Sequence, residues 1–467
     1  MKTKIKKLIT LFSLVVLSGQ GCTKALPAET IAASQPITLK VWAVVDDVDV
    51  YQDVIAAYRV SHPNVAVEYS RFRLEEYKSQ LLNALAEDRG PDVFLIHNTW
   101  TNEYATKTVP MPTTTKTAYR VTTGSIKKEL TWEMRTEPTL SMIEFKNQYA
   151  DVVQHDLLRT IDVSTDAQKK NYQERLMGVP IGVDTMALYY NKDLLNAAGI
   201  PTPAENWSQF SEQVKPLTKV DAQGNILQSA AGIGTADNVE RATDLLTLLM
   251  MQSGQDMEDD AGYPVFSKMP AIITNAENPP SHLALQFYID FADPNKTVYT
   301  WNNQMQNSLD AFTSGRTAYF FGYAYQYDLI RANAPKINLG LSKMPQIEGN
   351  DQKNFANYWN WVVAKKSLHK DVAWNFLMQM TQPDLLQKIL TKAKRPSARK
   401  SLLAAQLQDE RIGVFASQVL TATSWYRGKD SAAMEQILRE LIVSAASGTP
   451  LVKAIKFASD QIAMTIK

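Results

Sequence analysis

The chain has 467 residues, of which 45% are hydrophobic and 21% charged, a composition typical of globular proteins with large apolar cores. With 49 basic and 48 acidic residues its formal charge is +1, which gives no bulk basic field for binding nucleic acid. One cysteine and five histidines exclude a disulfide framework, a dithiol redox centre and a cysteine-ligated metal cluster. At about 150 residues per domain, the length indicates two or three domains.

Residues 1–21 have the layout of a secretory signal. Four lysines precede an apolar run over 8–17, which is too short to span a bilayer as a helix of about 20 residues. Cys22 follows at once, and this junction resembles a bacterial lipoprotein cleavage site, although Gly19 stands where an aliphatic residue is usual. An unpaired thiol is a liability in an oxidising compartment, so we expect lipidation of Cys22 rather than an ordinary signal with an incidental thiol. Cleavage would leave a mature charge of −3, with residues 22–36 as a small, polar tether.

Strands and helices are expected to alternate over residues 37–96. Three strand-like segments, at 37–45, 65–72 and 92–96, are separated by two segments whose apolar residues follow helical spacing. Such alternation favours a parallel sheet covered by helices, and ligands of such sheets bind beyond the carboxyl ends of the strands. The polar and aromatic residues at such ends are Asp46, Asp47, Asn98, Thr99 and Trp100.

The rest of the chain repeats this α/β pattern after an irregular stretch. Residues 101–178 contain loop material and a helix within 139–160, and we interpret them as an insertion or elaboration of the first lobe. An apolar strand then leads to Tyr190, a helical stripe covers 207–217, and a strand follows at 317–321. No internal repeat of solenoid period is found, and no stretch after residue 21 approaches 18 uninterrupted apolar residues.

Several segments, taken in order, resemble the family 1 extracellular solute-binding proteins, the maltose-binding-protein-like receptors of ABC importers. The strongest piece is Gly178–Lys219, which begins Gly-Val-Pro-Ile-Gly-Val-Asp-Thr-Met-Ala-Leu-Tyr-Tyr-Asn-Lys. The others are the strand Gly90–Ile96, the helix–glycine–strand element Ala311–Gly322, the helix in Lys365–Leu377 and the proline turn Arg395–Arg399. The resemblance spans 37–467 apart from the 101–178 stretch.

This resemblance implies an α/β fold of the type II periplasmic-binding-protein class. Two lobes, each with a mostly parallel sheet flanked by helices, would enclose a ligand cleft. Lobe 1 is expected over 37–182 and 356–394, and lobe 2 over 183–355 and 395–467. The implied function is that of an extracytoplasmic substrate-binding component of an ABC importer, which captures a carbohydrate by hinge closure and delivers it to a membrane permease. We expect a monomer with no cofactor and no metal, lipid-anchored through Cys22 on the periplasmic side or the outer surface.

Sugars present apolar C–H faces and many hydroxyls, so their sites combine aromatic platforms with carboxylates and amides. By resemblance, ligand contacts fall after the first and third strands, in the crossing segments, after Gly322 and near the C-terminus. The candidate ligand-binding residues are Asp46, Asp47, Asn98, Thr99, Trp100, Asp184, Tyr323, Tyr325, Trp359 and Trp425.

Each candidate has a structural alternative. Asp46 or Asp47 could cap the following helix, and Asp184 could be a hydrogen-bonding group of the hinge. Tyr323 and Tyr325 could pack in the core or at a rim.

The tryptophans divide in the same way. Trp359 and Trp361 lie on one face of a strand, so one could line the cleft while either could be buried. Trp425 has polar neighbours and lies outside any apolar stripe, which favours the cleft. Trp207 and Trp374 lie on helical stripes and are expected in the core.

Three other functions compete with sugar capture. A glycan hydrolase needs two opposed carboxyls, and the sequence singles out no acid and base pair and no Gly-x-Ser-x-Gly or His-Glu-x-x-His motif. A receptor of the same fold could bind a polyamine or another small cation on aromatic and acidic groups. A structural or adhesive lipoprotein could have kept the fold and lost the cleft.

Overall fold

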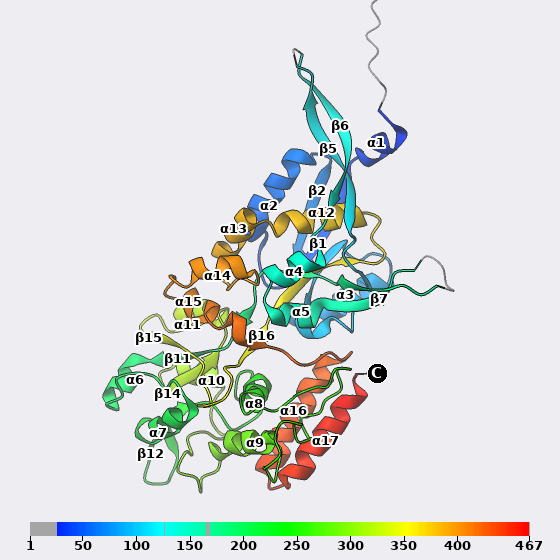
Figure 1. Cartoon of the computed structure of the whole chain (residues 1–467). Helices are drawn as coiled ribbons and strands as arrows, with labels where there is room; N and C mark the ends of the chain where they lie inside the picture. The colour runs from blue at the N-terminus through cyan, green and yellow to red at the C-terminus, as the bar shows by residue number, and fades with distance from the viewer. Residues whose placement is uncertain (1–25, 126, 165–168, 467) are drawn as a thin grey trace, which may run out of the picture.

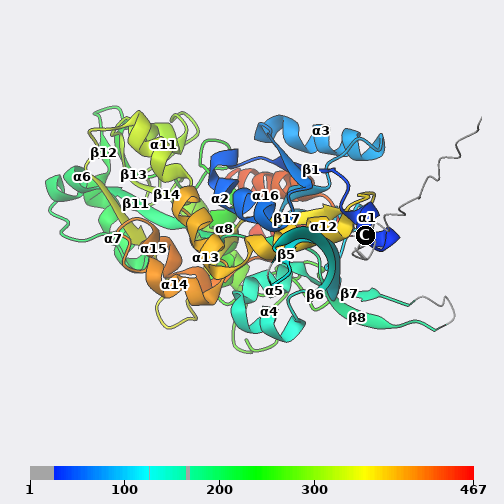
Figure 2. The same cartoon turned by 90° about the horizontal axis from the view of Figure 1, so that it is seen from above.

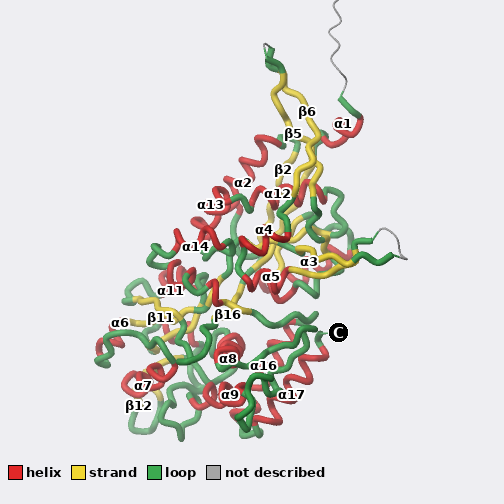
Figure 3. Tube along the Cα trace, in the orientation of Figure 1, coloured by secondary structure: helices red, strands yellow, loops and turns green. Residues whose placement is uncertain are grey.

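The chain folds into two α/β lobes, as the sequence predicts (Figure 1). The computed structural model describes residues 26–125, 127–164 and 169–466. The expected signal at 1–21 and Cys22 lie outside the described residues. Figure 3 shows strands in both lobes, with β16 (Asn354–Asn357) between them and the ribbon of β5 (Thr114–Thr123) and β6 (Glu129–Pro138) projecting from lobe 1. Among the described residues, no helix combines the length and the apolar character needed to cross a bilayer.

Lobe 1 is built on a six-stranded sheet in the order β2-β1-β3-β17-β4, with β9 also paired to β17, and β17 runs opposite to the other five strands. Strand β1 runs parallel to β2 and β3, and β17 runs antiparallel to β3, β4 and β9. The three expected strands form within two residues of their predicted bounds. The strands are β1 Ile37–Ala43, β2 Val65–Arg71, β3 Val93–His97, β4 Thr108–Val109, β9 Val179–Pro180 and β17 Trp359–Ala364.

Helices cover both faces of this sheet because the side chains of each strand alternate between the faces. On one face, Phe94 of β3 packs with Tyr77 of α3, and on the other, Leu95 packs in the cluster that contains Tyr58 of α2 and Trp374 of α12. Figure 2 shows α3 on one side of the sheet and α12 on the other. The helices are α2 Val48–Ser61, α3 Leu74–Ala86, α12 Lys370–Met380 and α13 Pro383–Ala393.

The irregular 101–178 stretch forms two hairpins and two short helices on lobe 1. The long ribbon β5–β6 projects away from lobe 2, and α1 lies beside it, with an ion pair of 2.5 Å between Lys116 and Glu29 (Figure 1). The described part of the expected tether is therefore helical and packed on the lobe. The elements are α1 Ala28–Ala33, β5 Thr114–Thr123, β6 Glu129–Pro138, α4 Met142–Gln148, α5 Asp151–Leu157, β7 Leu158–Asp162 and β8 Tyr172–Leu176.

Lobe 2 is built on a five-stranded sheet in the order β12-β13-β14-β11-β15. This sheet is mixed rather than mostly parallel as expected, because β11 runs antiparallel to both of its neighbours and only β13 and β14 are parallel. The strands are β11 Ala187–Asn191, β12 Lys219–Val220, β13 Ile226–Ala231, β14 Thr317–Gly322 and β15 Leu339–Lys343. The helices are α6 Lys192–Ala197, α7 Trp207–Leu217, α8 Ala242–Gln252, α9 Pro280–Asp290, α10 Ser308–Thr313, α11 Gln326–Asn333, α16 Ser431–Ala446 and α17 Leu451–Met464.

Three chain crossings join the lobes, and a small sheet in the order β10-β16-β18 lies among them. Asp184 of β10 pairs with Asn357 of β16, and Phe355 pairs with Thr423 of β18. The segment 398–422 packs its apolar side chains in a cluster that contains residues of both sheets, with Phe415 against Tyr189 of β11, whereas 425–462 packs within lobe 2. The crossing elements are β10 Asp184–Thr185, β16 Asn354–Asn357, α14 Lys400–Gln406, α15 Ile412–Ala416 and β18 Ala422–Thr423.

Candidate functional site

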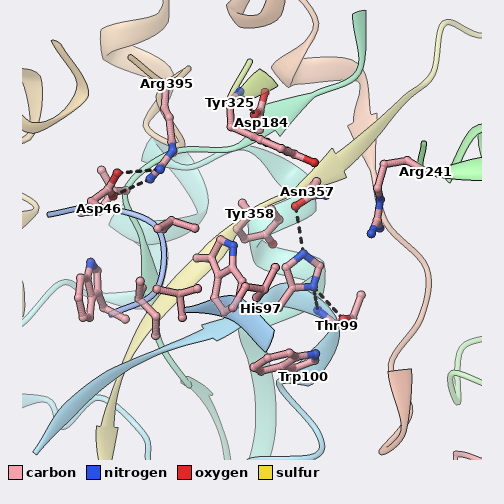
Figure 4. Close-up of a pocket in the computed structure, with 18 of the residues that line it drawn as sticks. Asp46, His97, Thr99, Trp100, Asp184, Arg241, Tyr325, Asn357, Tyr358 and Arg395 are labelled. Carbon is pink, nitrogen blue, oxygen red and sulfur yellow. Dashed lines mark hydrogen bonds and ion pairs between the residues drawn. The ribbon is translucent and has the colours of Figure 1, made fainter. Parts of the chain in front are cut away.

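A cavity of about 440 Å³ lies between the lobes, at the carboxyl ends of β1 and β3. Lobe 1 and the crossing segments form most of its wall. Arg241 and Tyr325 reach it from lobe 2 (Figure 4), as does Glu435. Six of the predicted ligand-binding residues line it together. They are Asp46, Thr99, Trp100, Asp184, Tyr325 and Trp359.

Aromatic rings form one wall of the cavity. The Trp359 ring meets the Trp100 ring edge-on at 5.3 Å between centroids, and it meets the His97 ring at 5.4 Å. Trp100 is held from behind by Tyr104, whose ring is stacked on it at 5.9 Å. Trp361 also lines the cavity from the same face of β17 as Trp359, in agreement with the predicted alternation. These rings offer flat apolar surface to a small molecule.

His97, at the end of β3, belongs to this wall as a neutral group. Its Nδ1 lies 2.8 Å from Thr99 Oγ1 and its Nε2 lies 3.0 Å from Asn357 Oδ1 (Figure 4). Burial lowers the pKa of His97 to about 4, so the imidazole is uncharged at neutral pH. It therefore fixes the positions of Thr99 and Asn357 without adding charge to the cavity.

Asp46 is neutralised in place by Arg395. The guanidinium donates two hydrogen bonds of 2.7 Å to the two carboxylate oxygens (Figure 4). The hydroxyl of Tyr51 donates a third, of 3.0 Å. Although burial opposes the charge, the neighbouring Asp46 raises the pKa of Arg395. Arg395 lies in the turn that follows α13. Two residues later, Ser397 forms a β-bridge with Gly182, just before the first crossing segment.

Asp184 lies in the first crossing segment, where it faces the cavity and also accepts hydrogen bonds from the backbone. Its side chain lines the cavity, and it accepts backbone hydrogen bonds of 3.0 Å from Ala324 and 2.9 Å from Thr185. Burial raises the pKa of Asp184 to about 6 despite these donors. Tyr325, half exposed at the start of α11, projects beside it (Figure 4).

The lobe 2 side of the cavity carries a second carboxylate–guanidinium group. Arg241 donates two hydrogen bonds of 2.8 Å to Asp244, and its Nη2 lies 3.5 Å from a carboxylate oxygen of Glu435. Arg241 has a left-handed backbone with φ of 53°, which is uncommon outside glycine and is strained. With this backbone conformation, Arg241 directly precedes α8 and its side chain lines the cavity.

Four predicted ligand-binding residues do not line this cavity. Asp47 points outward to Arg71, at 2.6 Å, and makes no capping hydrogen bond with the helix that it precedes. Asn98 is buried and donates to Asp156 at 3.0 Å. The Tyr323 hydroxyl donates to Asp244, and Trp425 packs on Phe266 in the lobe 2 core. Trp207 and Trp374 are buried in the cores of their lobes, as predicted.

Sequence reasoning missed several residues of the cavity. His97 precedes the predicted Asn98 at the end of a predicted strand, so the same strand-end argument could have found it. Arg395 lies in the proline turn that carried part of the family resemblance, but nothing local pairs it with Asp46, 349 residues away. Arg241 and Glu435 carry no sequence signal at all. Within the described residues, no group of three or more His, Cys, Asp or Glu side chains could hold a metal ion.

The chain belongs to the family of bacterial extracellular solute-binding proteins, whose sequence profile matches residues 53–412. This confirms the family resemblance found in the sequence. The galactooligosaccharide-binding protein of Bacillus subtilis (strain 168) is 23% identical over 268 residues, which cover 55% of this chain and 59% of that protein. The chain thus spans less than two thirds of the length of the curated relatives that it matches.

Solved structures of binding proteins share the two-lobed fold. The GacH receptor of Streptomyces glaucescens, solved without ligand and with acarbose, has a TM-score of 0.65 at 18% identity, covering 92% of this chain and 98% of that one. The sugar-binding protein MalE of Xanthomonas citri has a TM-score of 0.67 at 18% identity, covering 92% and 97%. At this level of identity the likeness establishes the fold, and the ligand has to be argued from the cavity.

Proposed function

We propose that this protein is the extracytoplasmic substrate-binding component of an ABC importer and that its ligand is a neutral carbohydrate. The two lobes would close about the crossing segments on a sugar held in the cavity, and a membrane permease would receive it. Ligand that contacts both lobes favours the closed arrangement by its differential affinity for it.

The observation that carries the proposal is the pairing of charge beside an aromatic wall. Both guanidinium groups of the cavity, Arg241 and Arg395, already face carboxylates, so neither is free to neutralise an anionic ligand. Trp100 and Trp359 provide apolar faces of the kind that sugar rings stack on. Paired carboxylates and guanidinium groups retain lone pairs and N–H groups that can exchange hydrogen bonds with hydroxyls.

The related proteins support the same ligand class. One relative is named for galactooligosaccharides, and the structural neighbours include proteins solved with acarbose and with maltotetraose. A cavity of about 440 Å³ falls within the range of small-molecule sites, about 300–1,000 Å³.

We infer that the chain binds its ligand without altering it. Asp46 is occupied by Arg395 and Tyr51, and Asp184 by backbone N–H groups, so neither carboxylate is placed as a free acid or base. Oligosaccharides incubated with the purified protein should therefore be recovered intact, and turnover would contradict the proposal.

A thermal-shift panel of neutral sugars, oligosaccharides and polyamines tests the ligand class. A sugar at 100 times its Kd adds about 2.7 kcal/mol of stability, and calorimetry then gives the affinity. Trp100→Ala and Trp359→Ala should each weaken binding by about 10-fold to 100-fold, whereas Trp132→Ala, on the β5–β6 ribbon outside the cavity, should not.

Two other outcomes would replace the proposal. A response to polyamines alone would assign the aromatic wall, Asp184 and Glu435 to a cationic ligand. No response to any solute would favour the structural or adhesive role.

We also propose that Cys22 carries the lipid that anchors the protein to the membrane. A Cys22→Ser chain should be released from the cell envelope into the soluble fraction, while the unchanged chain should partition into detergent. Equal partitioning of the two chains would refute the anchor and leave the ligand proposal intact.

A further inference from the structure

A cluster of buried and half-buried charges joins the two lobes outside the ligand cavity. His155 and Asp156, at the end of α5 in lobe 1, face Glu258 and Arg427 of lobe 2. His155 Nδ1 lies 2.9 Å from Asp156, and its Nε2 lies 2.7 Å from Glu258. The imidazole thus bridges a carboxylate of its own lobe and a carboxylate of the other lobe.

The lobe 1 end of this cluster is fully satisfied. Asp156 is 3% exposed, and besides His155 it accepts hydrogen bonds from Tyr358 at 2.6 Å, from Asn98 at 3.0 Å and from Ser424. Ser424 comes directly after β18, so this carboxylate also lies against a crossing segment. Removing Asp156 would leave several buried donors unsatisfied, whereas His155 at the seam can be changed more safely.

The lobe 2 end continues the alternation of charge. Arg427 donates to the two oxygens of Glu258 at 3.0 and 2.9 Å, and the carbonyl of Arg427 accepts a hydrogen bond from Asn102 of lobe 1. The side-chain oxygen of Asn102 in turn accepts a hydrogen bond of 2.8 Å from Arg159 Nε. Nη1 of Arg159 donates a hydrogen bond of 3.3 Å to the carbonyl of His155. The charged groups that face His155 are therefore Asp156, Glu258, Arg159 and, beyond Glu258, Arg427.

This cluster lies directly behind the aromatic wall of the cavity. Asn98, bound to Asp156, begins the short 3-10 helix Asn98–Trp100 that carries Thr99 and Trp100. Tyr358, also bound to Asp156, lines the cavity itself. His155, Glu258 and Arg427 do not line the cavity, so they can act on the ligand only through these neighbours or through the lobe arrangement.

We propose that His155, Asp156, Glu258 and Arg427 form an interlobe latch that sets the resting arrangement of the lobes and positions Trp100 and Thr99 for the ligand. This proposal rests on the proposed hinge closure. Its residues would act through their neighbours and are therefore positioning residues. The contact between His155 and Glu258 would have to break when the lobes separate along this seam.

The latch requires a charged imidazole. Burial lowers the pKa of His155, but its hydrogen bonds to Asp156 and Glu258 outweigh burial and raise the pKa to about 9. The same contacts hold the pKa of Asp156 below its ordinary value although burial opposes this. The contribution of His155 is therefore complete below its ordinary pKa of about 6.5 and is lost as the pH rises through about 9.

Interlobe distances measured without any ligand test the latch. In a Cys22→Ser background, spin labels are attached to cysteines introduced at Val60 of α2 and Val452 of α17, which are both exposed. Double electron–electron resonance between the two labels then measures the separation of the lobes. We expect one distance distribution at pH 6–8 and a second one that grows as the pH passes 9. His155→Gln and Glu258→Gln should each raise the second population at pH 7.5 by about fivefold to tenfold and remove the alkaline transition, and the double variant should do no more.

The control is an ion pair of one lobe. Lys146 and Glu174, 2.5 Å apart, join α4 to β8 within lobe 1, so Lys146→Gln with Glu174→Gln should leave the distances and their pH profile unchanged. An unchanged distance distribution and an unchanged alkaline transition in His155→Gln would overturn the latch. The distances are measured without ligand. If no sugar shifts the melting temperature but His155→Gln changes the distance distribution as expected, only the ligand proposal is refuted.

Discussion

Arg395 and Asp46 form the ion pair that should matter most to this site, and replacing Arg395 tests how buried charge is held there. Arg395→Met keeps much of the side-chain volume but removes both hydrogen bonds of 2.7 Å to the carboxylate. Asp46, only 6% exposed, would keep a single side-chain donor, the hydroxyl of Tyr51 at 3.0 Å. The variant therefore leaves a buried carboxylate without its counter-charge.

The expected cost follows from burial. Breaking a buried pair by removing one partner costs about 3–5 kcal/mol, because the remaining charge cannot recover its hydration. The adjacent carboxylate provides a matched control, since Asp47 pairs with Arg71 at 2.6 Å while the two side chains are 65% and 49% exposed. Arg71→Met should cost less than about 1 kcal/mol. The double variant Asp46→Asn with Arg395→Met should recover more than half of the loss, because it removes the stranded charge.

Urea unfolding of the purified protein at pH 7 measures these free energies, provided that the slope with denaturant is the same in all variants. Sugar affinity should fall in Arg395→Met and stay unchanged in Arg71→Met, because only Arg395 lines the cavity. Equal stability losses in the two single variants, or a double variant no more stable than Arg395→Met, would refute the reasoning.

Three further predictions concern other residues of the molecule. Because burial raises the pKa of Asp184 to about 6, a sugar hydroxyl that donates to its carboxylate should bind with constant affinity above about pH 7 and more weakly as the pH falls through 6. Calorimetry between pH 5 and 8 should show this dependence in the unchanged chain and its loss in Asp184→Asn. Trp425→Ala should cost about 3–5 kcal/mol in urea unfolding, since the ring is 4% exposed against Phe266, with sugar affinity within twofold for the folded protein. Tyr323→Phe should cost about 1–3 kcal/mol by the same measurement, because Asp244 loses the hydroxyl donor at 2.6 Å.

Local pattern was sufficient to find β1, β2 and β3 and the strand ends at which the cavity lies, but it did not find the β5–β6 and β7–β8 hairpins. The apolar run of β3 and the residues after it predicted that Thr99 and Trp100 lie at a strand end, and both line the cavity there, because the carboxyl ends of neighbouring parallel strands meet at one edge. Within a pair of neighbours, however, the pattern did not tell which side chain turns inward. In the loop between β1 and α2, Asp46 faces the cavity and Asp47 faces Arg71.

Other side-chain positions could not be predicted because they depend on contacts with residues far away in the sequence. Trp425 has polar neighbours in sequence, yet its ring packs on Phe266 and so belongs to the lobe 2 core. Tyr323 lies two residues from Tyr325, but its hydroxyl is drawn inward by Asp244 of α8. Such contacts depend on how helices dock on the sheet, which hydrophobic spacing within one element does not specify.

The charged groups of the molecule separate into two kinds with respect to hinge motion. Around the cavity, Arg395 pairs with Asp46 beside the first crossing segment, and Arg241 pairs with Asp244 and Glu435 entirely within lobe 2. In the proposed hinge closure such pairs would keep their partners, so their hydrogen-bonding groups would present a constant surface to the ligand. The contact from His155 to Glu258 joins the two lobes and cannot survive their separation. In the proposed mechanism the cavity pairs would therefore present the same groups to the solute in both arrangements, whereas the latch would hold the lobes and, through Asn98 and Tyr358, also position the cavity wall.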